Sequence, residues 1–222
     1  RQGIDKNILD LVTEMKSGKV DAMIVMDANP AYDLPEASDF AAAMSKVKTS
    51  IFMSSVPNET GALCNYTAPT PHFLEAWGDV EPKKGMFSIV QPTISPLFDT
   101  RQGEESLLVW ASSANLDQTS DQPYYEYLKA NWEASMFPMQ NNFMSFQSFW
   151  DKTLHDGVFT AKASEPAINM VADVNAYLNK ISKPGKGEEI VLFETIAMGA
   201  GEYADNPWLQ ELPDPVSRTT WG

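Results

Sequence analysis

Two stretches of the sequence specify the fold: AMIVMDANPAYDLPEA (residues 22–37) and SIFMSSVPNETGALCNYTAPTPHFLEAWGD (residues 50–79). Each contains a short apolar run, Ala22–Met26 or Ile51–Ser55, followed by a polar, turn-forming loop and then by a helix-like pattern. Such runs are typical of parallel strands that are covered on both faces. The sequence therefore predicts an α/β fold with a Rossmann-like, mostly parallel sheet flanked by helices.

Further elements are expected around these two strands. Apolar residues at helical spacing predict helices over residues 4–17 and 33–47, which would pack on the sheet. Tyr66–Pro69 has the pattern of another short strand. Residues 79–100, with the apolar run Met86–Val90, suggest an irregular hairpin or an extended arm that lies over the edge of the sheet.

Changes in pattern along the chain predict three regions. Residues 1–100 form the α/β core, and residues 101–187 carry helix-like patterns typical of a mainly helical insertion or subdomain. Residues 188–222 begin with a returning strand, Ile190–Thr195, and end in a Pro- and Trp-rich segment, Asp205–Gly222, that we expect to be an extended tail.

Composition excludes several classes of partner and site. The formal net charge is −14, from 30 acidic and 16 basic residues, and the basic residues do not cluster, so a nucleic-acid backbone or an anionic membrane surface would be repelled. The single cysteine, Cys64, excludes a disulfide within this chain and a cysteine-ligated cluster held by it alone. No apolar run reaches the roughly 20 residues of a membrane span. Because the chain begins with Arg1 rather than methionine, we expect a piece of a longer protein.

The candidate binding residues follow the two strands, where ligands of open α/β sheets bind. Asn29, before Pro30, could donate its amide to a carbonyl or phosphate group. Asn58, Glu59 and Thr60 lie at a predicted helix start, where exposed N–H groups favour an anion or a hydroxyl-rich ligand. An ordinary turn followed by a helix cap would contain the same residue types as such a binding site. The negative charge of Glu59 would also oppose a phosphate.

Evidence for catalytic chemistry is sparse. No GxSxG motif, phosphate-binding loop or dinucleotide fingerprint occurs, and the sequence predicts no catalytic residue and no metal ligand. His72 and Glu75 could share one face of a helical turn, but two ligands do not make a metal site. An unrelated α/β enzyme that uses this pair on a small substrate stays open as an alternative.

Several of these motifs, in this order, resemble the large subunit of the molybdopterin oxidoreductase superfamily. The resemblance is carried by VDAMIVMDANPAYDLP (residues 20–35), SSVPNETGALCNYTAPTPHFLEAWGD (54–79), GMFSIVQPTISPLFDTR (85–101) and NPWLQELPDPVSRTTWG (206–222). Within the superfamily the chain is most similar to the molybdopterin-oxidoreductase-like, iron–sulfur-bearing subunit of alternative complex III, a bacterial quinol-oxidising complex. Residues 101–187 match less specifically.

The resemblance assigns the candidate residues to a cofactor cleft. It implies that Asn29-Pro30 and Glu59-Thr60 occupy the positions that line the cleft for the pterin guanine dinucleotide in genuine molybdoenzymes. Asp27-Ala28 replaces the usual Gly-Gly or Gly-Glu, which puts a charge and a side chain where a phosphate needs close backbone approach. Gly85-Met86 replaces a typical Gly-Arg. Both departures disfavour an anionic dinucleotide and suggest a vestigial site.

The resemblance therefore implies a non-catalytic scaffold module of a respiratory electron-transfer subunit. No cofactor is expected in this fragment, and iron–sulfur clusters are expected elsewhere in the full chain. The expected partners are other subunits of a membrane-bound complex and the iron–sulfur domain of the same chain, without nucleic acid and without direct membrane insertion. The implied location is the periplasmic side of the bacterial inner membrane, as a peripheral protein. The alternative is a molybdopterin guanine dinucleotide-binding domain of an active molybdenum oxidoreductase.

Overall fold

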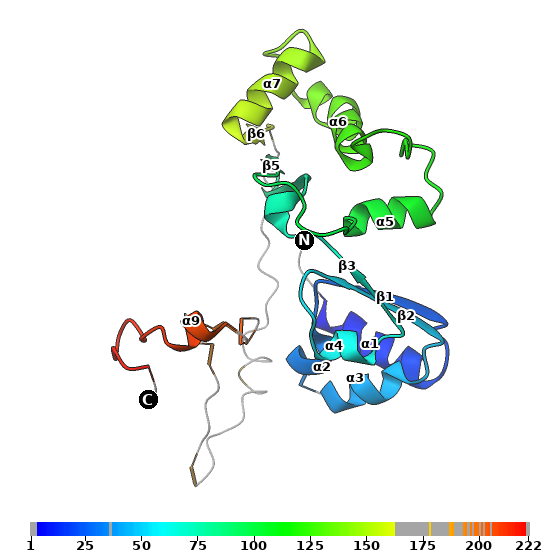
Figure 1. Ribbon diagram of the computed structural model, residues 1–222, viewed down its shortest axis with the longest axis vertical. Helices are drawn as coiled ribbons and strands as arrows, with labels where there is room; N and C mark the ends of the chain where they lie inside the picture. Colours follow the sequence, from blue (N-terminus) through cyan, green and yellow to red (C-terminus); the bar gives the residue numbers. More distant parts are fainter. Residues whose placement is uncertain are drawn as a thin grey trace. The chain divides into compact units, whose positions relative to one another are not determined.

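The computed structural model describes most of the chain in two compact units, Arg1–Glu165 and Pro166–Gly222 (Figure 1). The described residues of the first unit are 4–35 and 37–162. Those of the second are 178, 187–188, 193–194, 196, 198–199, 201, 203–204 and 206–220.

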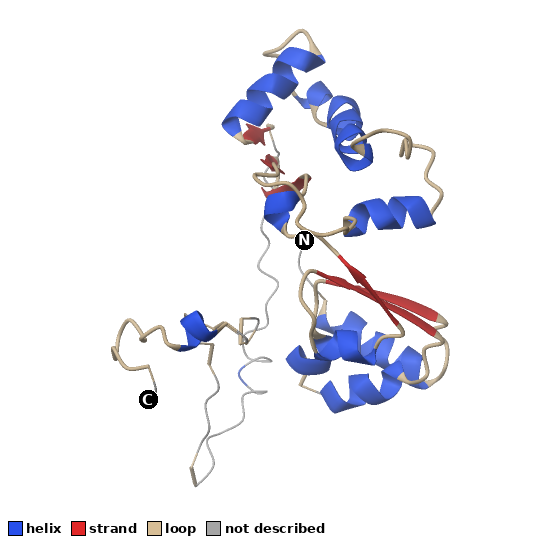
Figure 2. Ribbon diagram, in the orientation of Figure 1, coloured by secondary structure: helices blue, strands red, loops and turns tan. Residues whose placement is uncertain are grey.

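The first unit contains a three-stranded sheet in the order β1-β2-β3, with every pair parallel (Figure 2). Its strands are β1 (Ala22–Met26), β2 (Thr49–Ser54) and β3 (Tyr66–Pro69). The predictions of β1 and β3 are confirmed residue for residue, whereas β2 begins two residues earlier and ends one residue earlier than predicted. The predicted α/β fold class is confirmed.

Four helices cover one face of this sheet (Figure 2). They are α1 (Asp5–Lys16), α2 (Pro30–Asp33), α3 (Ala37–Met44) and α4 (Glu59–Leu63). A buried apolar cluster joins α1 and α3, and Met23 of β1 packs against it; its buried members are Val12, Met15, Phe40, Ala43, Met44 and Val47. The helix over residues 4–17 is confirmed, and Gly18 ends it with φ +70, a backbone conformation that glycine adopts without strain.

The opposite face of the sheet is only partly covered by the described residues. Ile24, Ile51 and Tyr66 pair in register across the three strands and so share this face. Ile24 is 43% exposed and Tyr66 is 64% exposed, whereas Met53 nearer the carboxyl ends is fully buried. Gly103 explains the difference, because it approaches the sheet so closely that a Cβ there would lie 2.7 Å from Met26 Cε and 3.5 Å from Met53 Cε. The expectation that both faces are covered is therefore wrong for this row of residues within the described part of the chain.

The predicted hairpin forms part of a second sheet. Strands β4 (Gly78–Lys83), β5 (Met86–Val90) and β6 (Val158–Thr160) are antiparallel in the order β4-β5-β6. The strand at Met86–Val90 is confirmed. Its expected position over the edge of the first sheet is wrong, because it lies between β4 and β6 and its Ile89 belongs to a separate apolar core.

That second core is largely aromatic. The helices of this region are α5 (Gly103–Trp110), α6 (Pro123–Ser135), the short 3-10 helix η2 (Phe137–Met139) and α7 (Phe146–Asp156). Another 3-10 helix, η1 (Phe73–Glu75), precedes β4. The buried members of the core are Ile89, Leu128, Trp132, Phe149 and Trp150. The indole Nε1 of Trp132 donates to Asp79 Oδ2 at 2.7 Å, so its polar atom is satisfied although the residue is fully buried. Strands from the predicted core region and helices from the predicted insertion thus share one core.

The second unit is described mainly over residues 206–220. Helix α9 (Pro207–Gln210) begins after Asn206, whose Oδ1 accepts hydrogen bonds from the two following backbone amides, Trp208 and Leu209. The prediction of an extended segment is therefore wrong for Pro207–Gln210, because Asn206-Pro207 starts a helical turn there. The last part of the predicted helical region 101–187 and the predicted strand Ile190–Thr195 lie almost entirely outside the described residues.

Candidate functional site

The candidate residues meet at the carboxyl ends of β1 and β2, as predicted. Asn29 Oδ1 accepts hydrogen bonds from the backbone amide of Thr60 at 3.1 Å and from Thr60 Oγ1 at 2.9 Å. The same Thr60 Oγ1 accepts from the backbone amide of Ala31 at 3.0 Å, and Thr60 is fully buried. These bonds fasten the loop after β1 to the start of α4.

Asn58 and Pro30 serve the ends of two short helices. Asn58 is the N-cap of α4: its Oδ1 accepts from the backbone amide of Gly61 at 2.9 Å, and its Nδ2 donates to the carbonyl of Ala28 at 3.4 Å. Pro30 is the first residue of α2, where a missing N–H costs nothing. Both residues therefore have structural roles that explain their presence.

Glu59 completes the network and makes it acidic. Asn29 Nδ2 donates to Glu59 Oε2 at 2.7 Å, and this bond, together with a backbone hydrogen bond, lowers the pKa of the exposed Glu59 carboxyl. The ionised form is thus favoured. Asp27 adds a second acidic side chain, on the loop after β1, with a positive φ of 44° at a position where glycine would be unstrained.

These residues do not fit the pyrophosphate of a pterin guanine dinucleotide. Every polar atom of the Asn29 amide that could reach a ligand is hydrogen-bonded to Glu59 or Thr60. The side chain nearest to it carries a negative charge, and Asp27 has a Cβ and a carboxylate where close backbone approach is needed. An anionic group here would have to break satisfied hydrogen bonds and approach two carboxylates.

An apolar pocket of about 410 Å³ adjoins this network. Asn29 and Pro30 lie at its border, while most of its lining is apolar, including Ile8 and Leu11 of α1, Met23 of β1 and Phe40 of α3. The polar side chains at the pocket are Asn29, whose amide is already hydrogen-bonded, and Asp33. The rest of the lining suits an apolar side chain, and the charge of Asp33 disfavours an anion.

His72 and Glu75 come together, but as a helix cap. His72 Nδ1 accepts from the backbone amide of Leu74 at 3.3 Å, and Glu75 Oε2 accepts from the backbone amide of His72 at 2.9 Å, which is a capping box at the start of η1. Glu75 Oε1 accepts from the backbone amide of Leu97 at 3.0 Å. Since both carboxylate oxygens hold backbone groups, the pair is better explained as structure than as an acid–base dyad.

Two further features are absent from the residues that the structure describes. No group of three or more His, Cys, Asp or Glu side chains there could hold a metal ion. Among the same residues, no helix is long and apolar enough to span a membrane.

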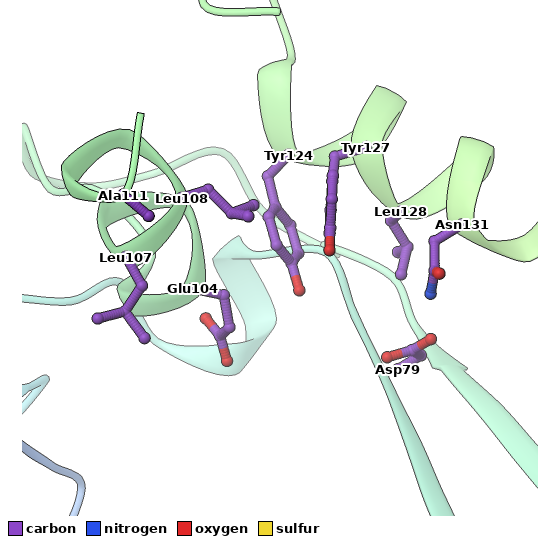
Figure 3. Close-up of a pocket in the computed structure, with 9 residues that line it drawn as sticks. All are labelled: Asp79, Glu104, Leu107, Leu108, Ala111, Tyr124, Tyr127, Leu128 and Asn131. Atoms are coloured by element: carbon purple, nitrogen blue, oxygen red, sulfur yellow. The ribbon is translucent and has the colours of Figure 1, made fainter. Parts of the chain in front are cut away.

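Sequence reasoning missed a second cavity, of about 460 Å³, between α5 and α6 (Figure 3). Its lining residues, which define the α5–α6 pocket, are Glu104, Leu107, Leu108 and Ala111 of α5, Tyr124, Tyr127, Leu128 and Asn131 of α6, and Asp79 of β4. The i, i+3, i+4 spacing of Tyr124, Tyr127 and Leu128 could have indicated an apolar helix face, but nothing in the sequence shows that this face meets α5 across a cavity.

Comparison with known proteins gives one clear relative. The menaquinone reductase molybdopterin-binding-like subunit of Nitratidesulfovibrio vulgaris (strain Hildenborough) is 33% identical over 100 residues, which is 43% of this chain and 14% of that protein. The predicted resemblance to molybdopterin oxidoreductases is confirmed. The chain spans about one seventh of the length of this relative. No protein-family model matches the chain.

A solved structure is also similar. Acetylene hydratase from Pelobacter acetylenicus matches with a TM-score of 0.47 and 15% sequence identity, over 70% of this chain and 21% of that chain.

Proposed function

We propose that this chain belongs to a non-catalytic scaffold module of a respiratory electron-transfer subunit that derives from a molybdopterin oxidoreductase. The observation that carries the proposal is the closed network at the strand ends. Asn29 and Thr60 occupy the positions expected of cofactor ligands, yet they are bonded to each other and to Glu59. A site that has lost its ligand can use its polar groups in this way without leaving any unpaired.

The role of such a module would be assembly. It would hold iron–sulfur domains, encoded elsewhere in the full chain, against partner subunits so that electrons pass from a quinol to an acceptor. The named relative supports this reading, because it is a subunit of a menaquinone reductase and is itself described as molybdopterin-binding-like. Within this class we propose a complex like alternative complex III, with the protein peripheral on the periplasmic side of the bacterial inner membrane.

Exposed aromatic side chains are available for docking. Trp208 of α9 is 83% exposed, which is unusual for a side chain of its size. The Trp208–Trp221 segment would then contact other subunits, with Trp221 itself outside the described residues. Limited proteolysis of the purified full-length protein tests this: the segment should be cut in the free protein and protected in the assembled complex.

The second candidate is a working molybdopterin guanine dinucleotide domain. It is favoured by the position of Asn29, Glu59 and Thr60 at the strand ends, where ligands of such sheets bind. It would require the Asn29–Thr60 bonds to open and the missing parts of the protein to supply cations.

Metal and pterin analysis of the full-length protein, purified from its native host, separates the two candidates. Iron without molybdenum and without pterin is the result expected of the scaffold. Molybdenum together with a guanine dinucleotide pterin would refute it, and loss of that pterin in an Asn29→Ala variant, compared with a Thr67→Val variant on exposed β3, would then locate the cofactor.

A further inference from the structure

The α5–α6 pocket has features of a binding site that the scaffold role does not explain. Its walls are apolar: Leu107 and Leu108 come from α5, and Leu128 comes from α6. Its volume of about 460 Å³ is larger than the space that one trapped water molecule occupies and is in the range of ligand pockets. The cavity lies within one unit, between elements whose positions are described.

A buried tyrosine points into this pocket with an unused hydroxyl group. Tyr124 is only 9% exposed, and its side chain extends from α6 toward the side on which Glu104 and Asp79 lie (Figure 3). Among the described residues its hydroxyl group has no hydrogen-bond partner. The hydroxyl oxygen is not one of the fully buried unpaired atoms, so it reaches solvent in the pocket and can donate to or accept from a ligand there. Tyr127 stands beside it, with ring centroids 5.9 Å apart.

Two carboxylates flank the tyrosines. Glu104 has no hydrogen bond or ion pair within the described part of the chain, and Asp79 is held in place by the indole of Trp132 at 2.7 Å through one oxygen, which leaves the other able to accept. No lysine, arginine or histidine lines the pocket. Burial raises the pKa of Tyr124, and the nearby charges of Glu104 and Asp79 raise it further.

This combination selects one kind of ligand chemistry. Two carboxylates and two aromatic faces attract a cation, and the leucine walls favour an apolar stem behind it. Phosphates, carboxylates and other anions would be repelled. A planar guanidinium matches best, because it can stack on a tyrosine ring and still donate to two separate carboxylates, which the compact ammonium of lysine does less well.

We propose that the α5–α6 pocket is a docking site for an arginine side chain of a partner subunit. The proposal rests on the scaffold function above and names the surface through which this module engages its complex. Charge complementarity supports a basic partner segment, since the chain carries a formal net charge of −14. The arginine would place its stem between Leu108 and Leu128 and its guanidinium between Glu104 and Asp79.

Photo-crosslinking in the native host tests this with the full-length protein in its complex. A benzophenone amino acid replaces Ala111, which is exposed and lines the pocket, and in a control protein it replaces Ala134, which is exposed on α6 outside the pocket. The expected result is a crosslink from position 111, absent from position 134, to a partner-subunit peptide that contains arginine. No crosslink specific to position 111, or a crosslink to a peptide without arginine or to a small amine, would overturn the proposal.

Charge variants at the pocket give the second measurement. Glu104→Lys supplies a competing cation and should lower the yield of the 111 crosslink at least about tenfold, with a smaller loss in the milder Glu104→Gln variant. Glu126→Lys, the same change at an exposed position of α6 outside the pocket, should leave the yield unchanged. Equal yields in all three variants would refute the proposal. Metal and pterin analysis of the same preparations reports on the scaffold function separately, so either idea can fail alone.

Discussion

Replacing Thr60 by valine tests the closed network at the strand ends. The two side chains have nearly the same shape, so the change removes a hydroxyl group from a fully buried position without leaving a large cavity. Asn29 Oδ1 keeps its bond from the Thr60 backbone amide, but the amide of Ala31 loses its acceptor at 3.0 Å. An unpaired buried donor costs about 2 kcal/mol. The local opened state should therefore become about 30-fold more populated.

Hydrogen exchange of the full-length protein, followed by mass spectrometry, measures this opening directly. Peptides covering residues 28–34 and 57–63 should exchange about 30-fold faster in Thr60→Val. Thr67→Val is the matched control, because Thr67 is exposed on β3 and its hydroxyl group has no bond to another described residue. If Thr60→Val exchanged like the native protein, or if Thr67→Val behaved in the same way, the network would not be what fastens the two loops.

Three further predictions concern the same region. The lowered pKa of Glu59 means that the folded state prefers the ionised carboxyl; the stabilisation is complete above the ordinary glutamate pKa of 4.5 and is lost as the pH falls through the folded value. Glu59→Gln should abolish this acid-dependent loss in denaturation curves, and unchanged curves would contradict it. Asp27→Ala should lower the free energy of unfolding by about 1 kcal/mol, because a positive φ is less favourable for alanine than for aspartate. Asp27→Gly should leave the free energy of unfolding unchanged or raise it. Gly61→Ala would place a Cβ 2.7 Å from the ring of buried Phe52; a loss of about 1–3 kcal/mol in chemical denaturation is expected, and a neutral result would show that the ring can move.

The sequence predicted the strands of the first sheet because local signals agree there. Apolar runs such as Ala22–Met26 end at Asn-Pro or Pro-Asn turns, and these turn residues need no tertiary contact to mark where a strand stops. The same logic placed Tyr66–Pro69 and Met86–Val90 correctly. It failed for Pro207–Gln210, where a helical turn follows Asn206-Pro207 in a segment expected to be extended.

The candidate site was predicted in part for the same reason. Strand-end polar residues in a parallel sheet must meet at one edge, so Asn29 and Thr60 could be placed together without a structure. Whether they face a ligand or each other depends on distances of about one ångström, which spacing along the chain does not encode. In the structure Asn29 bonds to Glu59 and Thr60, which supports the proposal of a closed site.

By itself, the sequence determined the α/β class, the parallel strands, the acidic character and the resemblance to molybdopterin oxidoreductases, because these depend on local patterns and composition. Only the tertiary structure decided which elements share a core. It joined Ile89 of a strand to Trp132 and Trp150 of distant helices, and it placed α5 opposite α6 so that an open pocket lies between them. The physical reason is that non-local packing depends on how whole side chains fill a common volume, which no single segment specifies.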